Sequence, residues 1–164
     1  MKILILGYGR MGQWFADQLK KDHFIAVYEK NKNGLNGRGQ FSFIHELEEI
    51  QSFKPDMVIN AVNLSATEQA FEEVEKHMEP STIFTDITSV KNGIMNYYEK
   101  KGIRYVSTHP MFGPTFANMD NLSKENAIII EESDEEGKIF FKEFYSKLGL
   151  NIRFISFNEK DKMI

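Results

Sequence analysis

Three glycines near the start of the sequence have the spacing of a phosphate-binding loop. They occur in the segment Gly7-Tyr8-Gly9-Arg10-Met11-Gly12, which matches G-x-G-x-x-G. In this pattern the first glycine permits a tight turn, the second lets the backbone approach a pyrophosphate, and the third lets a helix pack closely on a strand. The N–H groups at the start of that helix are then available to phosphate oxygens. The segment therefore predicts a dinucleotide-binding site that includes all six residues.

An acidic residue at the expected distance strengthens this prediction. Glu29 follows the glycines by about twenty residues and ends a second short apolar run. A carboxylate there accepts hydrogen bonds from the ribose hydroxyls of an adenosine and repels a 2′-phosphate, which favours NAD over NADP. Lys30 and Lys32 weaken that preference, because nearby cations tolerate the phosphate. The alternative is a glycine turn that binds no ligand and a surface Glu29.

A serine and a histidine follow two later predicted strands, where an open α/β sheet places its ligands. Ser89 lies in the segment Asp86-Ile87-Thr88-Ser89-Val90-Lys91, and His109 precedes Pro110. Proline holds the residue before it extended, and an imidazole titrates near neutral pH. His109 is therefore a candidate general base, oriented by the Ser89 hydroxyl. The alternative is an exposed loop histidine, with Ser89 as a helix cap.

The elements that must position these residues alternate between strands and helices. Continuous apolar runs are typical of strands buried on both faces, and helices carry apolar residues three or four positions apart. Strands are predicted over 3–6, 24–28, 57–62, 82–87, 104–107, 126–131 and 150–157, helices over 11–19, 44–50, 67–78, 92–100 and 135–148, and loops over 31–39, 108–123 and 131–136. This alternation predicts an α/β fold: a Rossmann-like, doubly wound, mainly parallel sheet with helices on both faces. Asn63 and Asp86 lie at the ends of two of these strands and are also predicted to contact the cofactor.

Composition excludes several classes of protein. The 164 residues suit one domain, and a net charge of −4 gives no basic surface for nucleic acid. The absence of cysteine excludes a disulfide scaffold, a thiolate zinc site and a cysteine nucleophile. No apolar run approaches the ~20 residues that span a bilayer, and no histidine pair has the spacing of metal ligands on a helix. We expect a cytoplasmic protein with a small-molecule substrate, no metal, and no nucleic-acid or membrane partner.

Taken together, three segments resemble the prephenate dehydrogenases of tyrosine biosynthesis. These are the glycine loop, the segment 86–91 and His109-Pro110-Met111-Phe112-Gly113-Pro114. The resemblance covers the nucleotide-binding domain of that family over essentially the whole chain. It implies an NAD-dependent oxidative decarboxylation of prephenate to 4-hydroxyphenylpyruvate. It also implies that His109 takes the proton of the ring hydroxyl, and that Ser89 positions this histidine and the nicotinamide.

The resemblance implies a further domain that this sequence does not contain. Members of the family carry a helical second domain with substrate-carboxylate contacts and the dimer interface, so we expect a homodimer only where that domain is present. Lys91 either contacts the substrate or begins the helix after Ser89 as a solvated residue, and the second alternative is favoured. Two alternatives stay open: an arogenate dehydrogenase, which shares the hydride chemistry, and a stand-alone NAD-binding module without catalysis.

Overall fold

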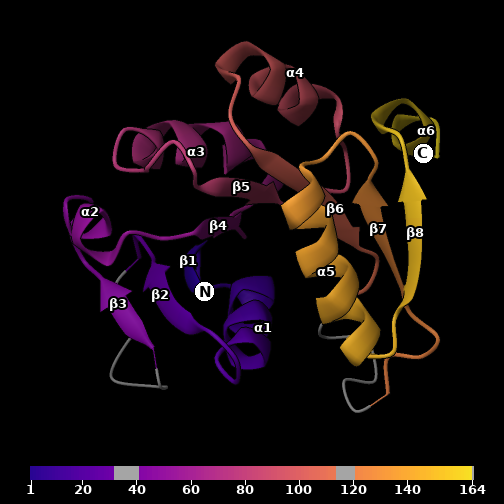
Figure 1. Ribbon diagram of the computed structural model, residues 1–164, viewed down its shortest axis with the longest axis horizontal. Helices are drawn as coiled ribbons and strands as arrows, with labels where there is room; N and C mark the ends of the chain where they lie inside the picture. Colours follow the sequence, from indigo (N-terminus) through magenta and orange to yellow (C-terminus); the bar gives the residue numbers. More distant parts are fainter. Residues whose placement is uncertain (32–40, 114–120, 164) are drawn as a thin grey trace. The chain divides into compact units, whose positions relative to one another are not determined.

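Strands and helices alternate along the chain, as the sequence predicts (Figure 1). The computed structural model describes residues 1–31, 41–113 and 121–163. The chain divides into two compact units, Met1–Thr82 and Ile83–Ile164. Each unit contains four of the described strands.

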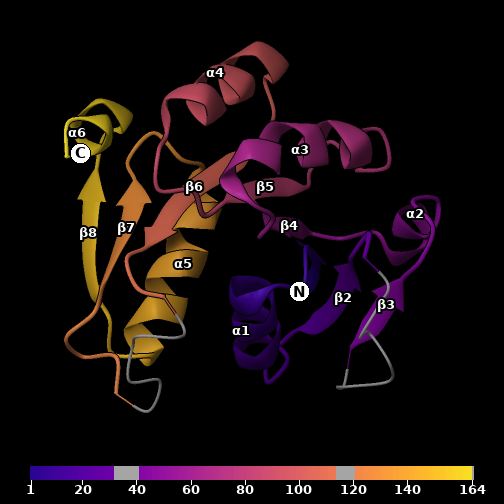
Figure 2. The same cartoon turned by 180° about the vertical axis from the view of Figure 1, so that it is seen from behind.

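The first unit is built on a parallel sheet in the order β3-β2-β1-β4. Helix α1 contacts β1 and β2, whereas α3 contacts β4, and Figures 1 and 2 show the two helices on opposite faces of this sheet. Strand β1 is almost fully buried from Ile3 to Leu6 because both of its faces are covered. The elements are β1 (Lys2–Leu6), α1 (Arg10–Leu19), β2 (Phe24–Tyr28), β3 (Ser42–Ile44), α2 (Glu49–Phe53), β4 (Met57–Asn60), η1 (Leu64–Ala66) and α3 (Thr67–Glu75).

The second unit combines parallel and antiparallel pairing. Strand β5 pairs parallel with β6, β6 antiparallel with β7, and β7 parallel with β8. Alternation along β6 separates its two faces: Thr108 hydrogen-bonds Tyr145 of α5 at 2.9 Å, whereas Tyr105 stacks on Tyr98 of α4 with ring centroids 4.2 Å apart. The elements are β5 (Ile83–Asp86), α4 (Asn92–Lys101), β6 (Tyr105–Pro110), β7 (Asn126–Ile130), α5 (Glu135–Lys147), β8 (Asn151–Ile155) and α6 (Phe157–Asp161).

Two strands differ from the sequence-based prediction. Ile44, which was expected in a helix, ends strand β3, because the backbone there pairs with Tyr28 of β2. The strand predicted over 104–107 continues to Pro110, since residues 108–110 pair with β7. The long connection predicted over 108–123 therefore begins after Pro110.

The end of the second unit also differs. The strand predicted over 150–157 stops at Ile155, and Ser156 caps a short helix by accepting the N–H of Glu159 at 3.1 Å. Most of the loop predicted over 31–39, and residues 114–120 of the predicted connection, lie outside the described residues. The Rossmann-like α/β prediction is confirmed: helices cover both faces of a mainly parallel set of strands.

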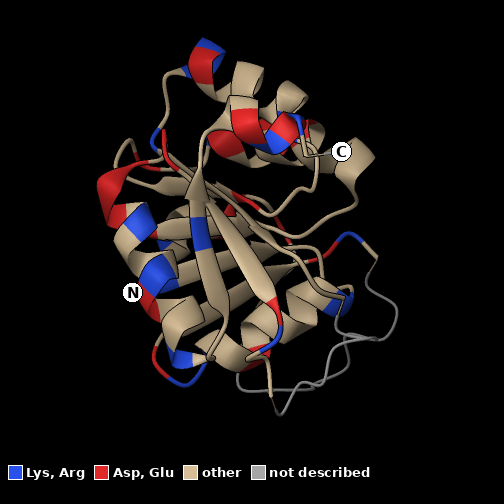
Figure 3. Cartoon of the chain, turned by 90° about the vertical axis from the view of Figure 1, so that its right-hand side faces the viewer, with Lys and Arg blue, Asp and Glu red and all other residues tan. Residues whose placement is uncertain are grey.

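Charge is distributed without a dominant sign. Lysine, arginine, aspartate and glutamate are interspersed on the side of the molecule drawn in Figure 3, in keeping with a net charge of −4. Within residues 1–31, 41–113 and 121–163, no helix combines the length and the apolar character needed to cross a membrane.

Candidate functional site

The glycine loop between β1 and α1 has the backbone that its sequence predicts. Gly7 adopts φ +90°, a left-handed conformation that other residues rarely adopt, and its N–H donates to the Tyr28 carbonyl at 2.9 Å. A Cβ atom at Gly12 would lie 2.2 Å from the Gly7 carbonyl oxygen. Helix α1 can therefore begin this close to the turn only if residue 12 is glycine.

Gly9 differs from the other two glycines, because a Cβ atom there would meet nothing within 4 Å. The protein itself thus leaves open space at Gly9, as a backbone approached by a phosphate group requires. Gly9 is also the N-cap of the ten-residue helix α1, and no side chain caps that end. Within the same loop Gly9 and Arg10 are exposed, and Tyr8 and Met11 are half-buried. The loop fits a pyrophosphate at the start of α1.

The Glu29 carboxylate at the end of β2 is held by two backbone amides. One oxygen accepts the N–H of Tyr8 at 2.7 Å, and the other accepts the N–H of Asn31 at 3.0 Å. Each carboxylate oxygen accepts more than one hydrogen bond, so these contacts orient Glu29 and leave it able to accept from ribose hydroxyls. The sequence-predicted acid therefore lies directly beside the glycine loop.

A pocket of about 290 Å³ opens at this place in the first unit. Gly7, Glu29 and Asn63 all line it, so the structure brings together three of the residues predicted to contact the cofactor. Its walls are mostly apolar with a few charged groups, which is usual for a small-molecule site. The lining residues are Leu6, Gly7, Tyr28, Glu29, Lys30, Val62, Asn63, Ala66, Gln69, Ala70, Glu73 and Val74.

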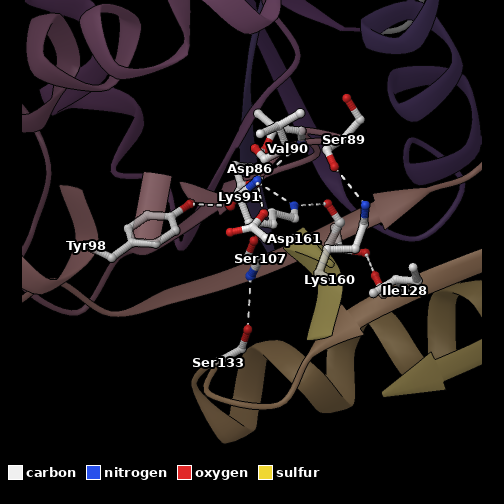
Figure 4. A network of polar contacts seen from close by, with 12 residues as sticks. Asp86, Ser89, Val90, Lys91, Tyr98, Ser107, Ile128, Ser133, Lys160 and Asp161 are labelled. Atoms are coloured by element: carbon white, nitrogen blue, oxygen red, sulfur yellow. Dashed lines mark hydrogen bonds and ion pairs between the residues drawn. The ribbon is translucent and has the colours of Figure 1, made fainter. Parts of the chain in front are cut away.

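In the second unit, Asp86 at the end of β5 is the centre of a buried polar network (Figure 4). One carboxylate oxygen accepts from Lys91 Nζ at 2.7 Å and from the Thr88 hydroxyl at 2.8 Å, and the other accepts from the Tyr98 hydroxyl at 2.8 Å. The side chains of Asp86 and Lys91 are both 0% exposed. The Asp86 side chain lies inside the protein, where it anchors its neighbours, and its predicted contact with the cofactor stays a prediction.

Lys91 differs most from the expectation based on the sequence, because its side chain is buried and not solvated. Its ammonium lies in the interior and also donates to the Thr108 carbonyl of β6 at 2.7 Å, so the expectation of a solvated lysine is wrong. Burial lowers the pKa of Lys91, and the adjacent Asp86 carboxylate opposes that shift. Lys91 does begin α4, as its N-cap residue. Its charge ties the start of α4 to the strand that carries His109.

His109 lies within β6, paired with Ile128 of β7, and not in a loop beyond the strand. Burial, together with the positive charges of Lys160 and Lys91 and against the opposing charge of Asp86, lowers the pKa of the imidazole to about 4. The imidazole is therefore neutral near pH 7 and can accept a proton. Its Nδ1 atom is buried and has no hydrogen-bond partner among the described residues.

Ser89 is held through its backbone. Its carbonyl accepts from Lys160 Nζ of α6 at 2.7 Å (Figure 4), and the neighbouring Asp161 accepts the Lys91 N–H at 3.0 Å. The Ser89 side chain is exposed, and no hydrogen bond joins it to His109 in the described part of the chain. The predicted orientation of His109 by Ser89 therefore stays a prediction.

Four residues of these two sites were not found from the sequence. Tyr98, Lys160 and Asp161 hold the segment 86–91, and Glu73 lines the pocket of the first unit. Charged side chains ordinarily lie in solvent, so no local signal marks Glu73, Lys160 and Asp161. Lys160 is nevertheless only 4% exposed.

The chain matches a known family and its relatives. Residues 15–147 match the family model described as prephenate dehydrogenase, nucleotide-binding domain. The chain is 30% identical over 153 residues to a probable arogenate/prephenate dehydrogenase of Methanocaldococcus jannaschii, covering 88% of this chain and 33% of the relative. It is 27% identical over 120 residues to the chloroplastic arogenate dehydrogenase 1 of Arabidopsis thaliana, covering 70% of this chain and 19% of the relative. The chain thus spans a third or less of these two relatives.

Solved structures share the fold. The prephenate dehydrogenase of A. aeolicus, solved with hydroxyphenyl propionate and NAD⁺, superposes with a TM-score of 0.83 at 19% identity, covering 99% of this chain and 62% of that one. The arogenate dehydrogenase of Synechocystis gives 0.82 at 19% identity, with 99% and 62% covered.

Proposed function

The chain belongs to the family of prephenate dehydrogenase nucleotide-binding domains, and from that premise we propose that it binds NAD and forms the cofactor-binding part of a dehydrogenase that acts on prephenate. The observation that carries this proposal is the glycine loop at the start of α1, where Gly9 leaves open space and the Glu29 carboxylate lies beside the turn. In the second unit His109 is held within β6, and a neutral imidazole is the form that can remove a proton.

The residues of the chain fit the proposed cofactor. Gly9 leaves space for a pyrophosphate at the start of α1, and Glu29 lines the neighbouring pocket with its carboxylate oriented for ribose hydroxyls. When bound, NAD⁺ supplies an acceptor for the hydride at C4 of the substrate. A carboxylate beside the ribose disfavours a 2′-phosphate, so we propose NAD in preference to NADP.

In the proposed reaction His109 would accept the proton of the C4 hydroxyl, and this would help the C4 hydride to leave to the acceptor that NAD⁺ would supply. The bond between the ring and its carboxylate then breaks, carbon dioxide leaves, and the electron pair of that bond completes the aromatic ring. The proton held by His109 then returns to the C4 oxygen, and the organic products are 4-hydroxyphenylpyruvate and carbon dioxide. Ser89 and Lys91 act by position: the first lies on a segment held by Lys160, and the second joins that segment to β6.

Replacing the proposed base tests this function. In the protein at its full encoded length, His109→Asn should lower the rate of NADH formation from prephenate by about a hundredfold or more, because general-base catalysis contributes that much. The affinity for NAD⁺, measured by calorimetry, should not change. The matched control is His45→Asn, since His45 is exposed in the first unit. Normal turnover of prephenate by His109→Asn would show that the base is wrongly assigned.

Arogenate is the second candidate substrate, because relatives named arogenate dehydrogenase are among the matches. Prephenate and arogenate share the reacting ring and differ in the side chain. Initial rates measured with each substrate distinguish the two, and a higher kcat/KM for arogenate would replace prephenate in the proposal. Binding of NAD⁺ with no turnover of either substrate would instead favour a non-catalytic NAD-binding module.

A further inference from the structure

An ion pair lies on the wall of the pocket in the first unit. Lys30 directly follows Glu29 at the end of β2, and its Nζ lies 2.5 Å from a carboxylate oxygen of Glu73 on α3. Both residues line the pocket that also contains Glu29. The side chains are 61% exposed for Lys30 and 26% for Glu73, so solvent reaches the ammonium while the carboxylate is partly enclosed. Glu73 thus holds a cation of the pocket wall that is next to Glu29 in the sequence.

A lysine in this place has a clear chemical consequence for nucleotide selection. A cation beside the ribose-binding acid accommodates a 2′-phosphate and so permits NADP. Lys30 stays protonated, since its hydrogen bond to Glu73 raises its pKa. Its charge is nevertheless matched by that of Glu73, and Glu29 adds a second negative charge in the same pocket. A phosphate that enters this pocket would have to take Lys30 away from Glu73.

We propose that Glu73 is a specificity-determining residue, which holds Lys30 in an ion pair and thereby excludes nucleotides that carry a 2′-phosphate. This inference rests on the proposed function, because it assigns the pocket to the adenosine ribose of NAD. Glu73 acts on nucleotide selection through Lys30. Neither residue has a part in the proposed proton transfer, which takes place in the second unit.

The test compares the affinities for NAD⁺ and NADP⁺ by calorimetry. Glu73→Gln should tighten NADP⁺ binding by about three- to tenfold, which is the scale of a partly exposed charge interaction, and should leave NAD⁺ binding unchanged. The matched control is Glu72→Gln, which removes the same charge from the adjacent, exposed position of α3 and should change neither affinity. If Glu73 had only a structural role, Glu73→Gln would weaken the binding of NAD⁺ and of NADP⁺ together.

A second background isolates the part played by Lys30. In the Lys30→Met background, Glu73→Gln should increase the affinity for NADP⁺ much less than it does in the unmodified protein, because no cation is left to release. An equal gain in that background would show that Glu73 repels the phosphate directly, and would overturn the inference. Unchanged NADP⁺ affinity in Glu73→Gln, with NAD⁺ still bound, would also overturn it and leave the proposed function standing. Failure of the unmodified protein to bind either nucleotide would overturn both.

Discussion

Two lysine–carboxylate pairs with nearly the same geometry lie in different surroundings. In the second unit Lys91 and Asp86 are 2.7 Å apart and both side chains are 0% exposed. In the first unit Lys30 and Glu73 are 2.5 Å apart, and their side chains are 61% and 26% exposed. An ammonium and a carboxylate group therefore pair in the protein interior in the second unit and at the surface in the first.

The difference in burial decides what each pair can do. A buried ion must keep its partner, because an unpaired charge in the interior is strongly unfavourable. Asp86 and Lys91 thus determine one geometry for the segment 86–91 and for β6. A surface pair adds little stability, so Lys30 and Glu73 contribute little to folding and can instead act on which ligand the pocket accepts. The first arrangement suits the positioning of reacting groups, and the second suits selection among ligands.

The largest expected effect on stability follows from removing Lys91, the buried partner of Asp86. Lys91→Met leaves the Asp86 carboxylate without its cation in the interior, and should lower the free energy of unfolding by about 3–5 kcal/mol. Lys30→Met, the matched substitution at the surface pair, should lower it by at most about 1 kcal/mol. Urea unfolding of the two variants measures both. Equal losses would contradict the contrast between the pairs.

The glycine loop also contains an enclosed position, Gly12, and an open position, Gly9. Gly12→Ala should lower the stability of the protein by about 1–3 kcal/mol, because the added Cβ meets the Gly7 carbonyl at 2.2 Å. Gly9→Ala should leave stability within about 0.5 kcal/mol and weaken NAD⁺ binding. Thermal unfolding and calorimetry separate the two effects. An undiminished affinity for NAD⁺ in Gly9→Ala would argue against a pyrophosphate at this loop.

A further expected effect is a pH dependence of the stability that is caused by His109. At pH above its ordinary pKa of 6.5 the imidazole is neutral in both the folded and the unfolded chain. Below that pH the unfolded chain takes up a proton, whereas the folded chain does so only near its pKa of about 4. Stability should therefore fall as the pH drops from about 6.5 to about 4, and His109→Gln should remove that part of the loss.

Nuclear magnetic resonance of the imidazole follows the same group directly. The folded pKa of His109 should rise in Lys160→Met, because a nearby positive charge is removed. The other charged groups that act on this imidazole are Lys91 and Asp86, and both stay in place in that variant. A pKa that does not move would show that the charge of Lys160 does not help to keep the imidazole neutral.

Most of the elements could be predicted from the sequence, because their signals are local. The buried run Ile3–Leu6, the positive φ at Gly7 and the acid Glu29 all depend on residue type and short-range spacing. Ile44 was misassigned because its apolar spacing with later residues fits a helix. Only pairing with β2 made it a strand.

The candidate sites were predicted in part. Gly7, Glu29 and Asn63 meet at one pocket, as their positions at strand ends suggested. His109 lies in a strand and not in a loop because it pairs with β7, which begins more than ten residues later in the sequence. A long connection separates the two segments, and nothing in the residues around His109 indicates that pairing.

The sequence by itself determined most of the strands and helices, the glycine turn and the acid beside it, because each depends on backbone preferences within a few residues. The tertiary structure alone decided which charges became buried and which met at a surface. Lys30 finds Glu73 across 43 residues, and Ser89 is held by Lys160 across 71. Such contacts depend on how separate elements pack, so a residue's own neighbours in sequence carry no signal for them.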